Sequence, residues 1–262
     1  MIQRIKILIL FMIFFSSLGI AQEKKYNFSL KKDLIIIGSG IGLTTLGIVF
    51  QNNADVAILE EINALDRRDI NRFDRGATSN NSSKARDISD IILYTSATLP
   101  IFAYLVPKCR FEESAVGIMA LETVLITSGL TNIAKGLSQR YRPFNYNPDV
   151  DIETKLGESS RKSFFSGHTS VTASMSFLMA SVITDVHPEM KNKYLIWTLA
   201  AAIPASIGYL RYEGGRHFPT DVITGYAVGA TVGYLIPKLH KSKKLEINTY
   251  GISGLRMSLN LN

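Results

Sequence analysis

The sequence is poor in the residues that build redox sites and thiolate metal sites. Its 262 residues include one cysteine, Cys109, and four histidines. A single cysteine cannot form an intrachain disulfide, and it excludes a metal site built from several cysteines. The basic residues form no lysine–arginine run with interleaved aromatic residues, which disfavours a nucleic-acid-binding protein. The net charge of +7 is scattered along the chain and fits an anionic substrate or a membrane surface.

The composition is typical of a folded chain with a sizeable core. Hydrophobic residues make up 46% of the sequence and charged residues 19%, which argues against global disorder. A chain of 262 residues is long enough for one large domain or two small ones.

The N-terminus has the features of an export signal, predicted over residues 1–21. Arg4 and Lys6 supply a basic start, an apolar run covers Ile7–Phe15, and Gly19–Ala21 offers a small-residue cleavage site. The alternative is an uncleaved anchor helix. In both cases the chain is sent to or across a membrane.

The expected fold is all-α, a membrane-embedded bundle of about six helices. Apolar segments lie at about 33–50, 88–106, 114–134, 169–184, 194–210 and 220–237. Each is close to the roughly 20 residues that cross the hydrocarbon of a bilayer. The third segment carries Glu122 and the fourth is rich in serine and threonine, so a soluble all-helical domain is the alternative.

These segments divide the chain into four parts. The signal (1–21) is followed by an N-terminal helix with a polar connector (22–84), a helical core (85–240) and a C-terminal tail (241–262). In the tail, apolar residues alternate with polar ones, which predicts a short strand. The alternating apolar residues are Leu255, Met257, Leu259 and Leu261.

The basic residues also predict a topology. If all six segments span, one face of the membrane carries Lys24–Lys32, Lys108 with Arg110, Lys191 with Lys193, and Lys238–Lys244. The positive-inside rule makes that face cytoplasmic, so the connectors with Arg142, His168 and His217 lie on the periplasmic face. A cleaved signal conflicts with this scheme, because residue 22 would then start outside. Either the signal is not cleaved conventionally, one segment does not span, or the domain is not transmembrane.

Three clusters of basic and imidazole groups lie at helix ends. In the first, Lys135 and Arg142 are seven residues apart, about two helical turns, which predicts that they project from one face. Pro143 pushes Arg142 out of helical geometry and ends the segment. Two cations aimed at one point suit a phosphoryl group. Taken alone, the pair is equally typical of a basic helix end at a membrane interface.

The second cluster is the sequence Ser166-Gly167-His168. Ser166 is a good N-cap for the helix that follows. Its hydroxyl and the free backbone N–H groups of Gly167 and His168 would form an anion site at the positive end of that helix. Taken alone, Ser166 could serve only as a cap.

The third cluster contains Arg211, His217 and Asp221. Pro219 fits the first position of a helix, which leaves His217 just ahead of the helix and Asp221 in its first turn. Asp221 is then expected to accept a hydrogen bond from the imidazole, fixing its tautomer and freeing the other ring nitrogen for attack. The alternative is a helix-capping aspartate beside an incidental histidine.

The occurrence of all three clusters in one chain favours a functional interpretation over the structural alternatives. Two of the four histidines lie in them, and His187 and His240 have no such neighbours. The order and spacing, Lys-x6-Arg-Pro, then Ser-Gly-His, then Arg-x5-His-x3-Asp, resemble the signature of the type 2 phosphatidic acid phosphatase superfamily. Class A bacterial acid phosphatases and vanadium haloperoxidases share that signature. The resemblance covers about residues 85–238.

This resemblance implies a role for each matching residue. His217 would be the nucleophile that forms a phosphohistidine, with Asp221 orienting it, and His168 would be the general acid and then the base. The remaining matches would neutralise or bind the phosphoryl oxygens: Lys135, Arg142, Ser166, Gly167 and Arg211. No metal or other cofactor is implied, since three cations stabilise the charge. The usual proline before Ser-Gly-His is Phe165 here, and the usual serine before the third-cluster arginine is Leu210.

Residues 33–61 also resemble the opening of a dinucleotide-binding fold. Asp33–Ile37 and Val56–Glu61 have the composition of strands, and Gly38-Ser39-Gly40 that of a phosphate turn. The third glycine of the fingerprint is Leu43, however, and no further βαβ unit follows. We therefore interpret these glycines as helix-packing positions in a membrane segment.

The sequence thus predicts an exported phosphatase at the inner membrane, with its active site facing the periplasm, or a periplasmic one. The expected substrate is a lipid phosphate monoester or pyrophosphate. The alternatives are a vanadium-dependent haloperoxidase or a soluble acid phosphatase using the same pocket, a flavin or nicotinamide oxidoreductase, and a non-catalytic membrane scaffold. The oligomeric state is not predicted.

Overall fold

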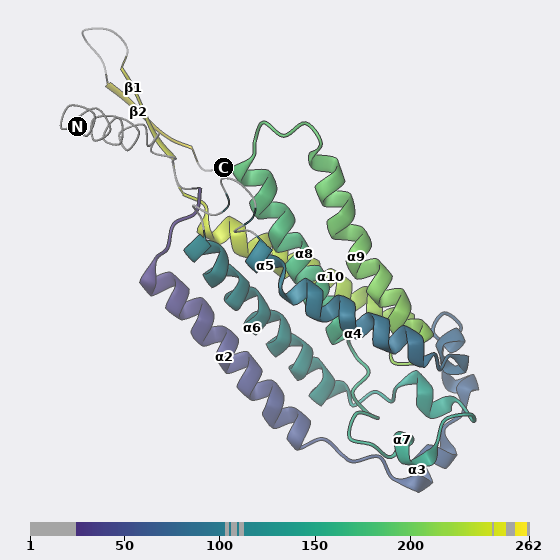
Figure 1. Ribbon diagram of the computed structural model, residues 1–262. Helices are drawn as coiled ribbons and strands as arrows, with labels where there is room; N and C mark the ends of the chain where they lie inside the picture. The colour runs from purple at the N-terminus through teal and green to yellow at the C-terminus, as the bar shows by residue number, and fades with distance from the viewer. Residues whose placement is uncertain are drawn as a thin grey trace, which may run out of the picture.

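The computed structural model describes residues 25–102, 105, 109, 113–242, 244–249 and 255–260. The export signal predicted over 1–21 lies outside these residues. Long helices dominate the described part of the chain (Figure 1). They are α2 (Leu30–Asn52), α4 (Ser83–Ala97), α6 (Glu113–Ser138), α8 (Gly167–Val186), α9 (Lys193–Glu213) and α10 (Pro219–His240). Each long helix coincides with one of the six apolar segments, so the all-α prediction is confirmed.

Short elements fill the connectors. They are α3 (Leu59–Ala64), α5 (Leu99–Phe102), α7 (Ile152–Lys155) and the 3-10 helices η1 (Arg67–Asp69), η2 (Arg75–Ser79) and η5 (Pro143–Tyr146). The segment expected over 88–106 is divided between α4 and α5, with Thr98 as the C-cap of α4. Pro100 follows at once, and its missing N–H cannot continue the hydrogen-bond ladder of α4.

The dinucleotide-binding alternative is wrong. Residues 33–37, which would have been its first strand, lie within α2, and residues 59–61 begin α3. Gly40 and Gly47 instead serve helix packing. A Cβ on Gly40 would lie 2.7 Å from Cβ of Leu125 on α6, and Gly47 is as close to Asn132. Gly38, in contrast, has open space at its Cβ position.

Apolar side chains on the outside of the bundle identify a membrane-embedded protein. Within the described residues, the helices long and apolar enough to cross a bilayer are α2, α8, α10 and the segment 114–146. Only 17% of the most apolar 18-residue stretch of α2 is buried. Most of this helix therefore faces outward, where lipid covers it favourably. Its exposed residues include Leu30, Leu34, Ile35, Ile41, Leu46, Ile48 and Val49.

Small residues bring α8 and α10 into backbone contact. Gly225, Gly229 and Gly233 lie one turn apart on α10, and a Cβ on each would clash with the backbone of α8. The backbone atoms they meet belong to Ser166, Ser170 and Ser174. Such a ladder of small residues allows close approach of two membrane helices. It fixes the N-termini of α8 and α10 side by side, and these termini carry the second and third sequence clusters.

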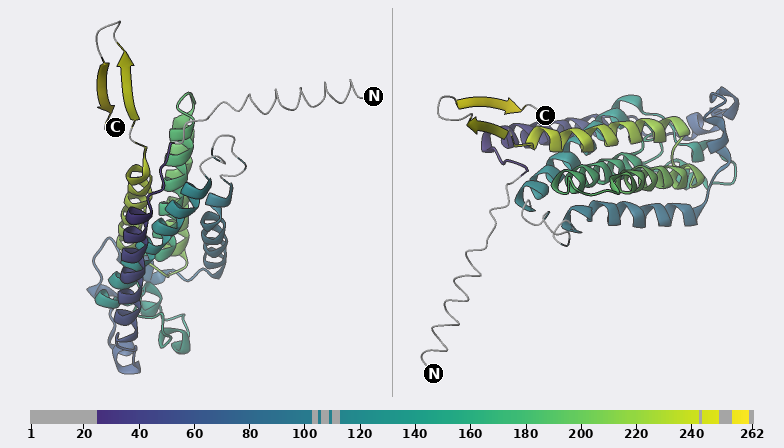
Figure 2. Two further views of the ribbon diagram at one scale, coloured as in Figure 1. Left: turned by 90° about the vertical axis from the view of Figure 1, so that its left-hand side faces the viewer. Right: turned by 90° about the horizontal axis from the view of Figure 1, so that it is seen from above.

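The bundle has two distinct ends. Figure 1 shows α3 and α7 at one end, and the strands β1 (Lys244–Thr249) and β2 (Leu255–Asn260) at the other. The two views of Figure 2 keep this arrangement. The strands pair antiparallel, with Leu245 opposite Leu259, which agrees with the strand predicted for the tail. Leu261 lies outside the described residues.

Candidate active site

The backbone between Lys135 and Arg142 is not the continuous helix that was expected. Helix α6 ends at Ser138, and the next residue, Gln139, has a left-handed φ of 42°. Lys135 is therefore in the last helical turn, while Arg142 is extended (φ −76°, ψ 154°) ahead of Pro143. The expectation that the two cations share one helical face is wrong, because a left-handed residue separates them. Pro143 does hold Arg142 in an extended conformation, as predicted.

Arg142 is anchored by backbone carbonyls. Its Nε donates to the carbonyl oxygen of Ser159 at 2.8 Å, and its Nη1 donates to that of Arg216 at 3.3 Å. Arg216 belongs to the loop between α9 and α10, so this bond links the first cluster to the third. The side chain is almost fully buried, which means that its charge is held in place and poorly hydrated.

The second cluster lies at the N-terminus of α8 as predicted. Ser166 is the N-cap, and its hydroxyl accepts a hydrogen bond from the backbone N–H of Thr169. The ammonium nitrogen of Lys135 lies 3.4 Å from the position that a Cβ on Gly167 would take. The first and second clusters therefore meet here, and Gly167 keeps the space beside the Lys135 ammonium open.

The third cluster is shaped by a tight loop between α9 and α10. The carbonyl oxygen of Arg211 accepts hydrogen bonds from the backbone N–H groups of Arg216 and His217, at 3.0 and 3.3 Å. Gly215 within this loop has a φ of 66°, which L-residues rarely adopt. Pro219 is the first residue of α10 as predicted, and the backbone N–H of Ser166 donates to the carbonyl oxygen of Asp221 at 3.0 Å.

Asp221 does not make the hydrogen bond to His217 that the spacing predicts. Its Oδ2 lies 3.6 Å from Nδ1 of His217, which is within ion-pair range and too long for a hydrogen bond. Other donors hold the carboxylate: Ser163 Oγ at 2.5 Å and the backbone N–H of Phe218 at 2.9 Å both donate to Oδ2. Nδ1 of His217 is left without a hydrogen-bond partner within the described residues.

An ion-pair network that sequence reasoning missed supports Asp221. Arg140 donates to Oδ1 of Asp221 at 2.6 Å and to Oδ2 of Asp74 at 2.8 Å. Asp74 in turn accepts from the backbone N–H and hydroxyl of Thr220. Burial raises the pKa of Asp74, but the hydrogen bonds from Arg140 and Thr220 outweigh it and lower that pKa below its usual range. Asp74 thus remains ionised at neutral pH. Its hydrogen bonds, with those of Arg140, brace the start of α10.

Asp90 on α4 is a second residue that sequence reasoning missed. Its Oδ1 lies 2.7 Å from Nε2 of His168 and accepts from Nη1 of Arg211 at 3.2 Å. Helix α4 is held here because the backbone N–H of Ser82 donates to the carbonyl oxygen of Glu213 at the end of α9. One signal was available: Asp90 is the only charged residue in the apolar segment 88–106, and a lone carboxylate there is a functional candidate.

The electric field of the site acts on His217. Its side chain is only 1% exposed. Burial, followed by the positive charges of Arg142, Arg211 and Lys135, lowers the pKa of His217 well below its usual range. The imidazole is therefore neutral at neutral and mildly acidic pH. Nε of Arg211 is also a buried donor, and it has no hydrogen-bond partner in the described part of the chain.

One cavity adjoins Lys135, and an apolar groove lies on two of the helices that carry the site. A cavity of about 260 Å³ is lined by Lys135 and Lys162 together with the end of α2 and the loop at 157–162. An apolar groove of about 360 Å³ lies between α4 and α9 and includes Ile92 and Ile203. The groove shares two helices with the charged site, because α4 also carries Asp90 and α9 also carries Arg211.

The geometry is that of a site for a small anion. Three cations, two imidazoles and the N-terminus of α8 converge at one end of a membrane-embedded helical bundle. Such a cluster suits a small tetrahedral anion, because phosphoryl transfer depends on positioning and on stabilising charge. The model of the PAP2 superfamily matches residues 116–244 of this chain.

Two curated relatives carry names of lipid phosphatases. The lipid A 4'-phosphatase of Porphyromonas gingivalis is 29% identical over 127 residues, which are 48% of this chain and 50% of the relative. The undecaprenyl-diphosphatase of Sulfolobus acidocaldarius is 27% identical over 154 residues, 56% of this chain and 67% of the relative. The match therefore spans half the length of the first relative and two thirds of the second.

Two solved structures are similar to the fold. A transmembrane PAP2-type phosphatidylglycerolphosphate phosphatase from Bacillus subtilis has a TM-score of 0.49 at 20% identity, covering 76% of this chain and 94% of that one. LpxE of Aquifex aeolicus has a TM-score of 0.42 at 25% identity, covering 60% and 88% of the two chains.

Proposed function

We propose that this protein hydrolyses phosphate monoesters or pyrophosphates of membrane lipids through a phosphohistidine on His217. The proposal rests on one observation: Lys135, Arg142 and Arg211 lie together with His168 and His217 at one end of the bundle. The names of the curated relatives, a lipid A 4'-phosphatase and an undecaprenyl-diphosphatase, agree with this substrate class.

The first half-reaction would transfer the phosphoryl group to His217. The neutral imidazole attacks phosphorus, and the bond from phosphorus to the leaving oxygen breaks. His168 gives a proton to that oxygen, so the lipid leaves as a neutral alcohol or as a lipid phosphate. Lys135, Arg142 and Arg211 stabilise the charge on the transferred group, assisted by Ser166 and the backbone N–H of Gly167.

The second half-reaction would release phosphate. His168, now neutral, takes a proton from water as the oxygen of that water attacks phosphorus. The bond from phosphorus to His217 breaks, and the imidazole regains its neutral form. Asp221 would orient His217 once the separation of 3.6 Å closes by a few tenths of an ångström.

The apolar groove between α4 and α9 supports a lipid over a soluble ester. Its lining includes Ile91, Ile92, Leu99 and Ile203, which suit an acyl or prenyl chain. A head group held at the cations would leave its chain along this groove. The substrate would thus remain partly in the membrane while its phosphate reaches the histidines.

We further propose that the catalytic end faces the periplasm of an exported inner-membrane protein. Lysines at the opposite end support this orientation through the positive-inside rule: Lys31, Lys32, Lys191, Lys193, Lys238 and Lys241. Labelling a cysteine introduced at Asn81 with a membrane-impermeant reagent in intact cells tests it, since protection of that cysteine would reverse the orientation.

The function is tested by phosphate release from a panel of lipid phosphates with the full chain purified in detergent. The panel holds phosphatidate, phosphatidylglycerophosphate, an isoprenyl pyrophosphate and lipid A, with a short-chain phosphate ester as the soluble comparison. We expect turnover of at least one lipid at a kcat/KM well above that of the soluble ester. Peroxide-dependent halide oxidation with vanadate and no phosphate release would contradict the proposal.

A variant pair tests the groove within the same panel. Ser206→Trp places a bulky side chain in the groove, whereas the neighbouring exposed residue Ala205 lies outside it. Ser206→Trp should raise the KM for the long-chain lipid about tenfold, the effect of one or two lost apolar contacts. Its KM for the soluble ester should not change, and Ala205→Trp should leave both KM values unchanged. Equal effects of the two variants would contradict the proposal that the groove binds the lipid chain.

Asp90 would act as a positioning residue for His168. Asp90→Asn should lower kcat for a lipid substrate about tenfold, a part of the 10²–10⁴ that a positioned acid contributes. The loss should shrink for an aryl phosphate, whose acidic leaving group departs without a proton. Comparing the two substrates measures this difference. A lower KM with unchanged kcat would mean instead that Asp90 merely occupies the phosphoryl position.

A further inference from the structure

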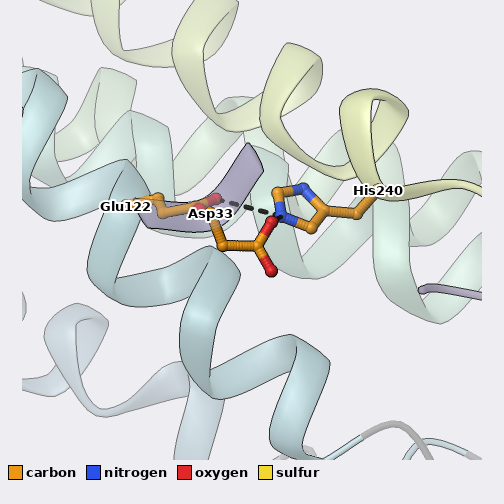
Figure 3. A group of neighbouring side chains, drawn as sticks. All are labelled: Asp33, Glu122 and His240. Carbon is orange, nitrogen blue, oxygen red and sulfur yellow. Dashed lines mark hydrogen bonds and ion pairs between the residues drawn. The ribbon is translucent and has the colours of Figure 1, made fainter. Parts of the chain in front are cut away.

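A second group of chemically active side chains lies at the opposite end of the bundle. Asp33 is in the first turn of α2, Glu122 is on α6 and His240 is the last residue of α10. Figure 3 shows the three side chains pointing toward one another from three helices. All three are buried, with side-chain exposures of 2% or less. His240 therefore has acidic neighbours in space that its sequence context does not indicate.

The orientation of the His240 ring is fixed by its own helix. Nδ1 lies 2.9 Å from the carbonyl oxygen of Ile236. A carbonyl only accepts, so Nδ1 carries the proton and Nε2 faces the two acids. This arrangement, with one ring nitrogen donating to a backbone carbonyl and the other presented to a ligand, is how metal-binding histidines are held.

The distances between the facing atoms suit a small metal ion. Nε2 of His240 lies 3.1 Å from Oδ1 of Asp33 and 3.3 Å from Oε2 of Glu122. All three potential ligand atoms are within 4.8 Å of one another. Ligands about 2.0 Å from a tetrahedral zinc ion are separated by about 3.3 Å. The two short separations therefore already match the edges of such a site.

The charges of the group require compensation. Both carboxylate oxygens of Glu122 are buried without a hydrogen-bond donor among the described residues. Oδ2 of Asp33 accepts from the backbone N–H of Ser29, and Lys32 Nζ lies 3.7 Å from Oδ1. The Lys32 side chain is 33% exposed, and its ammonium also donates to the carbonyl oxygen of Leu239. Nε2 of His240 is within hydrogen-bond distance of Oδ1 of Asp33. Two buried carboxylates that share one imidazole thus lack most of their counter-charge.

We propose that Asp33, Glu122 and His240 bind a divalent transition-metal ion of the zinc class. A divalent ion would displace the proton between Nε2 of His240 and Asp33 to water, and would supply two positive charges where the carboxylates and the imidazole converge. The imidazole ligand favours zinc-like ions over magnesium or calcium, which prefer oxygen ligands alone. The described residues offer three ligands, and water would complete a four-coordinate site.

The site would join three helices where the described part of the chain enters the bundle. Helix α10 separates His217 from His240 by 22 residues, or roughly 33 Å at 1.5 Å per residue. The ion would therefore take no part in the reaction proposed for the other end. It would hold the start of α2 against α6 and α10, where the helix packing by glycines begins with Gly40 about two turns further along.

The test measures metal content and thermal stability of the full chain purified in detergent. After incubation with ZnCl₂ and removal of free metal, we expect about one zinc ion per chain. Glu122→Gln, which keeps the size of the side chain, and His240→Gln should each lower the zinc content by more than about tenfold. Zinc should raise the Tm of the wild-type protein, and a chelator should reverse the rise. X-ray absorption should give metal–ligand distances of about 2.0 Å.

Matched variants separate this site from adventitious binding. His187→Gln removes a histidine outside both sites, and His217→Gln removes the one at the catalytic end. Both should keep the wild-type zinc content. Folding of each variant is checked by its elution from a size-exclusion column, so a variant that misfolds is replaced by Asp33→Asn. Equal zinc content in the wild type and in folded Glu122→Gln would overturn the proposal, whatever the phosphatase assay shows.

Discussion

Replacing His217 by glutamine is expected to lower phosphate release by about 10⁴-fold or more, to the level of the site without its nucleophile. Glutamine fills the space of the ring and cannot form a phosphoramidate bond that turns over. The measurement is single-turnover phosphate release with a lipid substrate that the wild type accepts. His187→Gln serves as the control, and near-normal activity of His217→Gln would remove the phosphohistidine mechanism.

The environment of His217 adds a pH dependence to this expectation. Its pKa is lowered well below the usual range by burial and then by the neighbouring cations. A lowered pKa means that the imidazole remains unprotonated, and therefore nucleophilic, as the pH falls through 6.5. Phosphoenzyme trapped by alkaline quench should accordingly form at pH 5.5 with the same amplitude as at pH 7.5. A loss of amplitude centred near pH 6.5 would show an ordinary imidazole.

The sequence was most informative where a feature depends on local chemistry. Ser166 caps α8 and Pro219 begins α10 because a side-chain acceptor and a missing N–H act within one turn of the chain. The six apolar segments became six long helices for a similar reason, since each needs only its own hydrophobic run. The three clusters also converge at one end of the bundle, as their motif spacing indicated.

Features that depend on tertiary contact escaped prediction. Asp90 meets His168 across 78 residues of sequence, and Arg140 meets Asp74 across 66. His240 meets Asp33 across 207 residues. No periodicity connects positions so far apart. The left-handed residue at Gln139 was equally hidden, because its helix-ending role has none of the glycine or asparagine signal that usually marks it.

Two carboxylates of these tertiary groups are nevertheless conspicuous in the sequence. Asp90 and Glu122 are each the only charged residue within an apolar segment, at 88–106 and 114–134. A carboxylate in such a segment is costly unless a partner or an ion accompanies it. Asp90 is found beside His168, and Glu122 in the buried group at the far end. Lone acids within apolar helices therefore deserve as much weight as histidine motifs when such a chain is interpreted.

The second large effect is expected at the cations. Neutral substitutions of Lys135, Arg142 or Arg211 by methionine or glutamine should each lower kcat by about 10²–10³, by analogy with the loss of one oxyanion donor. Each cation stabilises charge that grows in the transition state, so kcat should fall more than KM rises. Arg72→Gln is the matched control, because Arg72 is an exposed arginine of the connector.

Arg211→Lys sharpens the test, since it keeps the charge and loses the planar fork. Nη1 of Arg211 is bound to Ser89 and Asp90, while its buried Nε has no partner among the residues that the structure describes. We expect lysine to recover only part of the activity, because one ammonium cannot hold Asp90 and a phosphoryl oxygen in the same geometry. Full activity in Arg211→Lys would reduce Arg211 to a point charge. Full activity in Arg211→Gln would remove it from the phosphoryl site, and the convergence on which the proposed function rests would lose one of its three cations.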